Sequence, residues 1–175
     1  MYVDILTLAH LSARPAHGYE IKKAVERTLG HRFALNNNLL YPALKRFEDL
    51  GAVLCTVERQ EGRPDRRVYR LTERGAEVLQ GLLHDFSADL ARDEAEFLVR
   101  VAFFYLLDRP ARWDILRMRE SVLREHLAHF DRVLPQAERA DQRDAARVIA
   151  FLTQQIQHEL VWIAGLRREV EEERS

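Results

Sequence analysis

The chain has few of the features that mark secreted or membrane-bound proteins. Its 175 residues include one cysteine, Cys55, so no disulfide framework can form within one chain. The longest apolar run covers residues 101–107, which is far too short to span a bilayer. The N-terminus also lacks the basic-then-apolar order of a signal peptide. These absences predict a cytoplasmic protein without a membrane partner.

Signatures of the common enzyme classes are missing too. The sequence has no phosphate-cradling glycine-rich loop, no nucleophile elbow and no His-Glu-x-x-His zinc motif. His126 and His129 are three residues apart, a spacing that can share a metal on a helix, but no third ligand is nearby in the sequence. We therefore expect no catalytic residue, no metal and no cofactor, and we keep an enzyme only as an alternative.

The net charge of −1 conceals an asymmetry along the chain. Residues 1–75 contain 13 Lys and Arg against 9 Asp and Glu, which gives +4. Residues 76–175 contain 14 against 19, which gives −5, and the two values add to −1. A basic first part joined to an acidic second part predicts a polyanionic partner for the first part alone. We expect two domains, residues 1–75 and 76–175.

The order of elements predicts the fold of the first domain. Apolar spacing indicates a helix over residues 3–12, a second from His17 to Gly30, and a third that ends at Gly51. The second helix is expected to bury Ile21, Ala24, Val25, Thr28 and Leu29, and the third Leu40, Ala43, Leu44 and Phe47. Two strand-like segments follow, residues 53–58 and 67–71. Three helices and a two-stranded wing indicate a mainly α protein with an N-terminal winged helix-turn-helix.

The third helix carries the side chains that best suit DNA. Asn36, Asn37 and Asn38 precede it as candidate caps, and Tyr41 and Lys45 follow along its outer face. Asn can pair with an adenine edge, Lys with guanine or phosphate, and a tyrosine hydroxyl with phosphate.

Asn37, Asn38, Tyr41, Lys45 and Arg46 are therefore the predicted DNA contacts of this helix. The alternatives are that Asn37 or Asn38 only caps the helix and that the ring of Tyr41 packs on a neighbour.

Arginines crowd the expected hairpin. They are Arg59, Arg63, Arg66, Arg67 and Arg70. Because successive strand residues point to opposite faces, not all of them can meet DNA, and some are expected to pair with acidic neighbours. Arg63 in the turn and Arg66 beside it are the candidates for contacting phosphate or the minor groove. The alternative is an ordinary solvated face.

The second domain is expected to be helical. One apolar stripe runs from Leu79 to Leu90, and another runs from Leu116 to Leu134, where Pro135 is expected to end its helix. A third stripe, spaced by threes and fours, resembles a short coiled-coil seam and predicts homodimerisation through Leu152, Ile156, Leu160, Ile163, Leu166 and Val170. The alternative is an ordinary amphipathic core helix in a monomer.

Four sequence blocks carry a family resemblance. They are His17-Gly18-Tyr19-Glu20-Ile21, Leu40-Tyr41-Pro42-Ala43-Leu44-Lys45-Arg46, Glu61-Gly62-Arg63-Pro64 and Tyr69-Arg70-Leu71-Thr72-Glu73-Arg74-Gly75. In this order they resemble the PadR family of bacterial transcriptional regulators over residues 1–75. The sequence departs from the family pattern at Asn38 and Leu39, where Gly then Ser or Thr is common.

The resemblance implies a homodimeric winged-helix repressor of double-stranded DNA with an inverted-repeat operator. It also implies a C-terminal dimerisation domain and release of DNA when a small aromatic or cationic effector binds. Phe104, Trp113, His158 and Trp162 are candidates to line an effector pocket, although each tryptophan alone could simply pack a core. A helical adaptor that binds protein through its winged domain is the alternative function.

Overall fold

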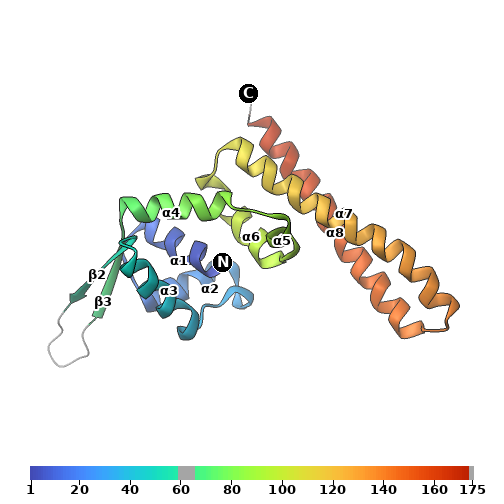
Figure 1. Cartoon of the computed structure of the whole chain (residues 1–175), viewed down its shortest axis with the longest axis horizontal. Coiled ribbons are helices and arrows are strands. Elements are labelled where there is room, and N and C mark those ends of the chain that lie inside the picture. The colour runs from blue at the N-terminus through green and yellow to red at the C-terminus, as the bar shows by residue number, and fades with distance from the viewer. Residues whose placement is uncertain (59–65, 174–175) are drawn as a thin grey trace. The chain divides into compact units, whose positions relative to one another are not determined.

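The elements follow the helix–helix–helix–hairpin order expected from the sequence, and further helices come after them (Figure 1). The computed structural model describes residues 1–58 and 66–173. The first elements are α1 (Tyr2–Ala13), β1 (Ala16–His17), α2 (Gly18–Leu29), the 3-10 helix η1 (His31–Phe33), α3 (Asn37–Asp49), β2 (Val53–Glu58), β3 (Arg66–Leu71) and α4 (Glu73–His84). Then come α5 (Ala88–Arg92), α6 (Glu94–Ala102), the 3-10 helix η2 (Phe104–Leu106), α7 (Arg109–Arg139) and α8 (Arg143–Glu172).

The chain forms two compact units. Unit 1 contains Met1–Asp85 together with Leu98–Leu107, and unit 2 contains Phe86–Phe97 and the chain from Asp108 onward. The predicted division into a DNA-binding domain, residues 1–75, and a dimerisation and effector domain, residues 76–175, concerns function and stays a prediction.

The core of unit 1 lies between α1, α2 and α3. Ile5, Leu6 and Leu8 of α1 are fully buried, and so are Ile21 and Val25 of α2. All four residues expected on the inner face of α3 are buried, namely Leu40, Ala43, Leu44 and Phe47. The predicted stripe of α2 is wrong at its end. Thr28 is exposed there, while the next residue, Leu29, is half-buried.

The sheet has one strand more than expected. Its order is β1-β3-β2, and both pairings are antiparallel. The long pair joins Val53 to Leu71 at one end and Glu58 to Arg66 at the other, which confirms the hairpin. β1 holds only Ala16 and His17, so no alternation of side chains could reveal it in the sequence.

The start of α4 is tightly joined to the rest of unit 1. Thr72 caps the helix as predicted, since its hydroxyl oxygen accepts from the Gly75 amide at 3.0 Å and donates to the Gly51 carbonyl at 2.8 Å. Gly75 lies so close to the backbone of Ala52 that a Cβ there would stand 2.1 Å from the Ala52 oxygen. Only glycine fits this approach.

Unit 1 also includes a segment from later in the chain. The buried guanidinium of Arg100 donates to the carbonyl of Leu82 at 3.0 Å and to that of Asp85 at 2.7 Å. These two carbonyls are at the C-terminal end of α4, where backbone oxygens lack helical partners. Arg100 therefore attaches residues 98–107 to α4.

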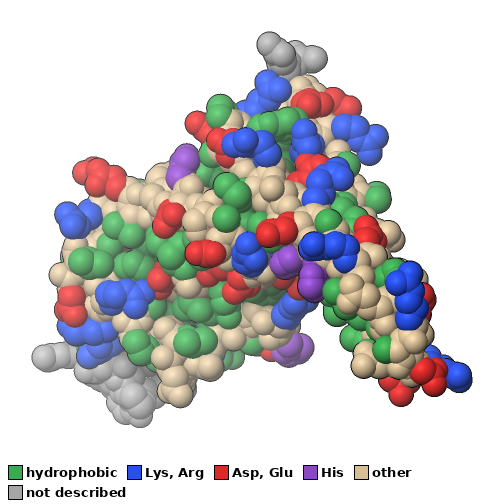
Figure 2. Space-filling model, turned by 45° about the vertical axis from the view of Figure 1, so that its right-hand side comes forward, with side chains coloured by type: hydrophobic (Ala, Val, Ile, Leu, Met, Phe, Trp, Pro, Cys, Tyr) green, Lys and Arg blue, Asp and Glu red, His purple; other side chains and the backbone are tan. Residues whose placement is uncertain are grey.

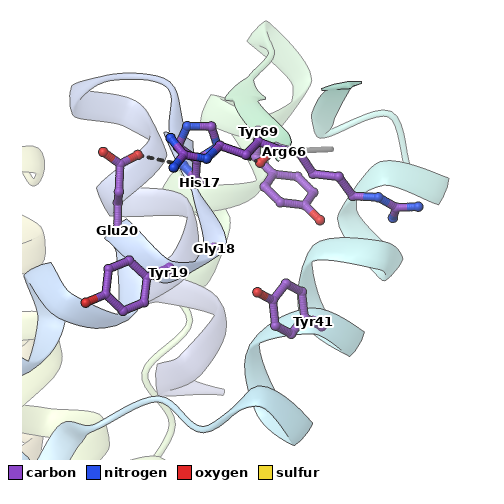
Figure 3. Close-up of a pocket in the computed structure, with 8 residues that line it drawn as sticks. His17, Gly18, Tyr19, Glu20, Tyr41, Arg66 and Tyr69 are labelled. Carbon is purple, nitrogen blue, oxygen red and sulfur yellow. Dashed lines mark hydrogen bonds between the residues drawn. The ribbon is translucent and has the colours of Figure 1, made fainter. Parts of the chain in front are cut away.

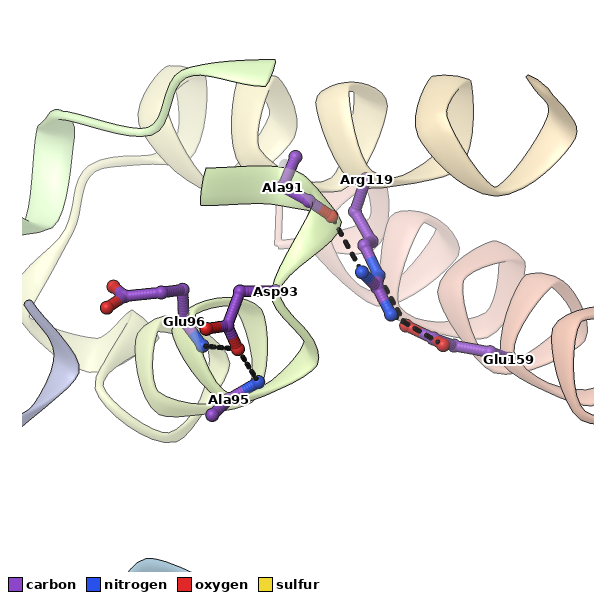
Figure 4. A network of polar contacts seen from close by, with 6 residues as sticks. All are labelled: Ala91, Asp93, Ala95, Glu96, Arg119 and Glu159. Carbon is purple, nitrogen blue, oxygen red and sulfur yellow. Dashed lines mark hydrogen bonds and ion pairs between the residues drawn. The ribbon is translucent and has the colours of Figure 1, made fainter. Parts of the chain in front are cut away.

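In unit 2, α7 and α8 pack as an antiparallel pair. Arg112 pairs with Glu173 at 2.8 Å, and Arg119 pairs with Glu159 at 2.7 Å. Arg119 also donates to the Ala91 carbonyl at 2.6 Å, so one buried guanidinium connects α5, α7 and α8 (Figure 4). A buried charge is tolerated when its donors are satisfied in this way.

The two prolines of the C-terminal half have different outcomes. Pro110 stands in the first turn of α7, where a missing N–H costs little, and the helical elements before it end at Leu106. Pro135 was expected to end the second stripe, yet α7 continues through it to Arg139. Because Pro135 is near the end of the helix, it removes a single backbone bond there, and the buried side chain of Ala137 beyond it still packs.

Part of the apolar stripe of α8 is buried by contacts within the chain. Ile163 and Val170 are buried, which fits the alternative of an ordinary core helix for these two. Leu152, Ile156, Leu160 and Leu166 are half-buried. Lys/Arg and Asp/Glu side chains are interspersed with apolar ones over the visible face of α7 and α8 (Figure 2). Within residues 1–58 and 66–173, no helix combines the length and apolar character needed to cross a membrane.

Replacing Gly75 by Ala is expected to destabilise the protein by about 2–3 kcal/mol, because backbone atoms cannot yield to the added methyl group. Urea unfolding followed by circular dichroism measures this. Gly81 in the same helix is the matched control, since a Cβ there meets nothing within 4 Å. Gly81→Ala should stabilise by about 0.5–1 kcal/mol. Equal effects of the two changes would refute the close approach.

Candidate nucleic-acid interface

The outer face of α3 exposes an aromatic and a basic side chain. Tyr41 is 43% exposed, and the Lys45 side chain is 64% exposed. Since the opposite face of the same helix is buried, α3 cannot rotate to hide them. The structure thus brings Tyr41 and Lys45 together on one surface, as the sequence predicted.

The three asparagines have different positions. Asn36 is the cap of α3, because its Oδ1 accepts from the Leu39 amide at 2.9 Å. Asn37 and Asn38 are in the first turn of the helix and are both exposed. The alternative that Asn37 or Asn38 caps the helix is therefore wrong. Asn37 instead accepts a 2.8 Å hydrogen bond from the Lys22 ammonium of α2.

A concave surface that borders a pocket with a volume of about 680 Å³ adjoins Tyr41 (Figure 3). Its lining comes from the start of α2, from α3 and from β3, and comprises His17, Gly18, Tyr19, Glu20, Tyr41, Arg66, Arg67 and Tyr69. The ring of Tyr41 lies against Gly18, where an added Cβ would stand 3.0 Å from the ring. Arg66 is therefore on the same surface as Tyr41, while Tyr19 of α2, 64% exposed, was not expected there.

Hydrogen bonds hold the start of α2 against β3. The His17 amide donates to the Glu20 carboxylate at 2.9 Å (Figure 3). The His17 ring donates from Nδ1 to the Arg67 carbonyl at 3.0 Å, since a carbonyl can only accept. Sequence reasoning used His17 and Glu20 only as part of a family motif. The contact of His17 with β3 depends on the short strand β1, which gave no sequence signal.

Hydrogen bonds favour the charged forms of Lys45 and Arg67. A hydrogen bond to Asp49 at 2.7 Å raises the pKa of Lys45. A hydrogen bond with the Tyr69 hydroxyl likewise raises the pKa of Arg67, while burial raises the pKa of Tyr69 itself. The Lys45–Asp49 pair is open to water, so a stronger anion can replace Asp49 at little cost.

Arg46 and Arg63 are two further residues that the sequence predicted to contact DNA. Arg46 pairs with Asp4 of α1, and its guanidinium lies 5.1 Å from the centre of the Phe47 ring. This contact ties α3 to α1 and takes Arg46 away from Tyr41 and Lys45. Arg63 lies outside the described residues.

The four residues predicted for an effector pocket are divided between the two units, with Trp113, His158 and Trp162 in unit 2. Trp113 stacks with Arg167 at 4.3 Å, and the ring of Trp162 meets Phe97 edge-on at 6.0 Å. His158 is exposed on α8, and Phe104 belongs to unit 1. Both tryptophans have packing partners inside unit 2, which fits the alternative stated for them.

A different cavity, of about 220 Å³, lies within unit 1. Its lining includes Ala9, His10 and Ala13 of α1, Val25 and Leu29 of α2, and Ala102 and Phe103. Nδ1 of His10 is shielded from solvent and makes no hydrogen bond of normal geometry. Burial lowers the pKa of His10, and the charges of Arg14 and Arg27 lower it further against the opposing effect of the Leu6 carbonyl. His10 is therefore uncharged at neutral pH.

Among the residues that the structure describes, no group of three or more His, Cys, Asp or Glu side chains is arranged to hold a metal ion.

Comparison with known proteins relates the part of the chain that carries this surface to a family. Residues 7–81 match the model of the transcriptional regulator PadR-like family. The negative transcriptional regulator PadR of Bacillus subtilis is 24% identical over 158 residues, which cover 87% of this chain and 81% of that protein. A PadR family transcription regulator of Clostridium difficile is 31% identical, and the match covers 46% of this chain and 81% of that one, with a TM-score of 0.40. Over residues 7–81 this chain is therefore PadR-like.

This PadR-like chain also matches the solved structure of Bacillus subtilis PadR in complex with operator DNA. That match has 17% identity and a TM-score of 0.46, and it covers 97% of this chain and 99% of the other. The family and these relatives are transcriptional regulators, not enzymes. The fold is mainly α, a winged helix-turn-helix with a helical C-terminal part, as expected.

Replacing Asn36 by Ala is expected to cost about 1 kcal/mol of unfolding free energy, because the Leu39 amide loses its cap. Asn38→Ala is the matched control, and it should change stability by less than about 0.5 kcal/mol because the residue is exposed. Denaturant midpoints of the two variants provide the comparison. A larger loss at Asn38 than at Asn36 would contradict the assignment of the cap.

Proposed function

We propose that this PadR-like chain is a sequence-specific DNA-binding repressor that acts as a homodimer and is released from DNA by a small molecule. One observation carries the DNA-binding part. Tyr41 and Lys45 project from a helix whose other face is wholly buried, so a rigid aromatic and cationic ridge faces outward. A major groove is wide enough to admit such a helix.

The neighbouring groups supply complementary contacts. Lys45 would exchange Asp49 for a phosphate or a guanine edge, and the Tyr41 hydroxyl would reach a phosphate. Arg66 on β3 and the exposed Tyr19 on α2 flank Tyr41 on the same concave surface. Arg46 is left out of the proposed contact set because it pairs with Asp4. The excess of positive charge in residues 1–75 supports the same partner.

Homodimerisation is supported by apolar surface on α8. Phe151 is 57% exposed and Val161 72% exposed, which is unusual for large apolar residues on a long helix. The half-buried Leu152, Ile156 and Leu160 lie on the same helix and could extend such a contact. A two-fold dimer would present two copies of α3. The matching operator would be an inverted repeat with half-sites about one helical turn apart.

Repression is supported by the sequence relative in Bacillus subtilis, which is named a negative transcriptional regulator. A bound dimer that occupies promoter DNA would exclude polymerase without any further chemistry. This fits a chain whose relatives are regulators and not enzymes.

The cavity beside His10 is the effector site that we propose within unit 1, and the pocket expected from Phe104, Trp113, His158 and Trp162 stays a prediction. The walls of the cavity beside His10 are largely apolar, and its polar lining includes Tyr105 and the neutral imidazole of His10, whose Nδ1 is shielded from solvent. Arg14 and Arg27 make the surroundings positive. Of the two effector classes expected, this favours an aromatic anion over an aromatic cation. Such a ligand must bind the DNA-free conformation more tightly, or it cannot shift the equilibrium.

Lys45→Ala should weaken binding to the promoter region of the chain's own gene about tenfold, since one charged contact is lost. Arg147→Ala is the matched control, because Arg147 is also exposed and basic but lies on α8 of unit 2. Fluorescence anisotropy at several salt concentrations measures both variants, and the stoichiometry should be two chains per inverted repeat. Salt-independent binding, or equal losses in the two variants, would favour the adaptor alternative.

Benzoate at about 100 times its dissociation constant should stabilise the free protein by about 2.7 kcal/mol, while benzylamine should not. His10→Leu, which keeps the apolar volume, should abolish the response to benzoate. Thermal unfolding with each ligand tests this, and DNA release by benzoate tests the regulatory link. A greater response to benzylamine, or an unchanged response in the His10 variant, would remove the effector site.

A further inference from the structure

Lys22 and Asn37 form a contact between α2 and the first turn of α3. The Lys22 ammonium lies 2.8 Å from the Asn37 side chain. An ammonium group has donors and no acceptor, so the Asn37 atom that it meets must be the carbonyl oxygen Oδ1. The orientation of the carboxamide follows from this chemistry, and its NH2 group remains available to donate.

This orientation changes what Asn37 can read. An asparagine that recognises adenine accepts from the N6 amino group and donates to N7. Here Oδ1 already accepts from a cation, and that cation would stand beside the amino group of an adenine. Guanine presents two acceptors, N7 and O6, along the same edge. The NH2 group of Asn37 can donate to one, and a remaining N–H of Lys22 can donate to the other.

The position of the pair suits a base contact. Asn37 is the first residue of α3, it is exposed, and the first residues of a recognition helix are the ones that meet base edges. Asn36 is used as the cap, so it does not compete for this role. Lys23, the neighbour of Lys22, is turned elsewhere, because its ammonium lies 5.4 Å from the centre of the Tyr19 ring.

We propose that Lys22 and Asn37 act as one donor-only unit that selects guanine at one position of each operator half-site. The inference rests on the proposed DNA binding and adds a specificity determinant from outside α3. Lys22 then acts as a positioning residue for Asn37 as well as a direct donor.

The test is selection of bound duplexes from a randomised half-site library by the full chain, followed by sequencing. The wild type should prefer guanine over adenine about tenfold at one position. Lys22→Met keeps the length of the side chain but frees Oδ1, so this preference should fall to about threefold or less and adenine should gain. Asn37→Ala should remove the preference at that position alone.

Lys23→Met is the matched control, since it loses the same charge from the adjacent residue without touching Asn37. It should weaken binding but leave the guanine preference intact. An unchanged base profile in Lys22→Met or Asn37→Ala would overturn the inference while leaving DNA binding in place. Equal changes of the base preference in Lys22→Met and Lys23→Met would mean that the lost charge alone causes the change. That outcome would also overturn the inference. Failure of the wild type to enrich any duplex would overturn the proposed function itself.

Discussion

Complete burial of the inner face of α3 is the constraint on which the rest of the structure depends. Leu40 and Leu44 are almost wholly excluded from solvent, and they pack in the core that α1 supplies. Burying two such side chains stabilises the helix position by about 3–6 kcal/mol, which is comparable to the whole stability of a small domain. With α3 held this firmly, the direction of its outer face is decided as well, and Tyr41 and Lys45 must face outward.

Around this helix, side chains divide between support and recognition. Asn36 and Arg46 are used within the fold, the first as a helix cap and the second in an ion pair with Asp4. Asn37 and Lys45 also have partners, but theirs are exposed and exchangeable. Asp4, the partner of Arg46, is only 20% exposed, whereas the Lys45–Asp49 pair is open to water, so a DNA group can replace Asp49.

In unit 2, a buried arginine supports the packing of helices. Arg119 is buried, pairs with Glu159, and donates to the Ala91 carbonyl (Figure 4). Its guanidinium also lies 5.5 Å from the centre of the Phe97 ring. The planar fork of donors lets this one residue join three helices, with a paired contact to the Glu159 carboxylate. The acidic and basic side chains of α7 and α8 thus contribute to their pairing as well as to their surface.

The sequence by itself determined the order of the elements, the inner face of α3, the Thr72 cap and the family. Each of these rests on local spacing or on a contiguous motif, such as Leu40 and Tyr41 at neighbouring positions of one helix. Only the tertiary structure decided which asparagine caps the helix, and that Lys22 holds Asn37. It also decided that a largely apolar pocket lies beside His10 in unit 1. These features join residues from different elements, and local patterns carry no information about such contacts.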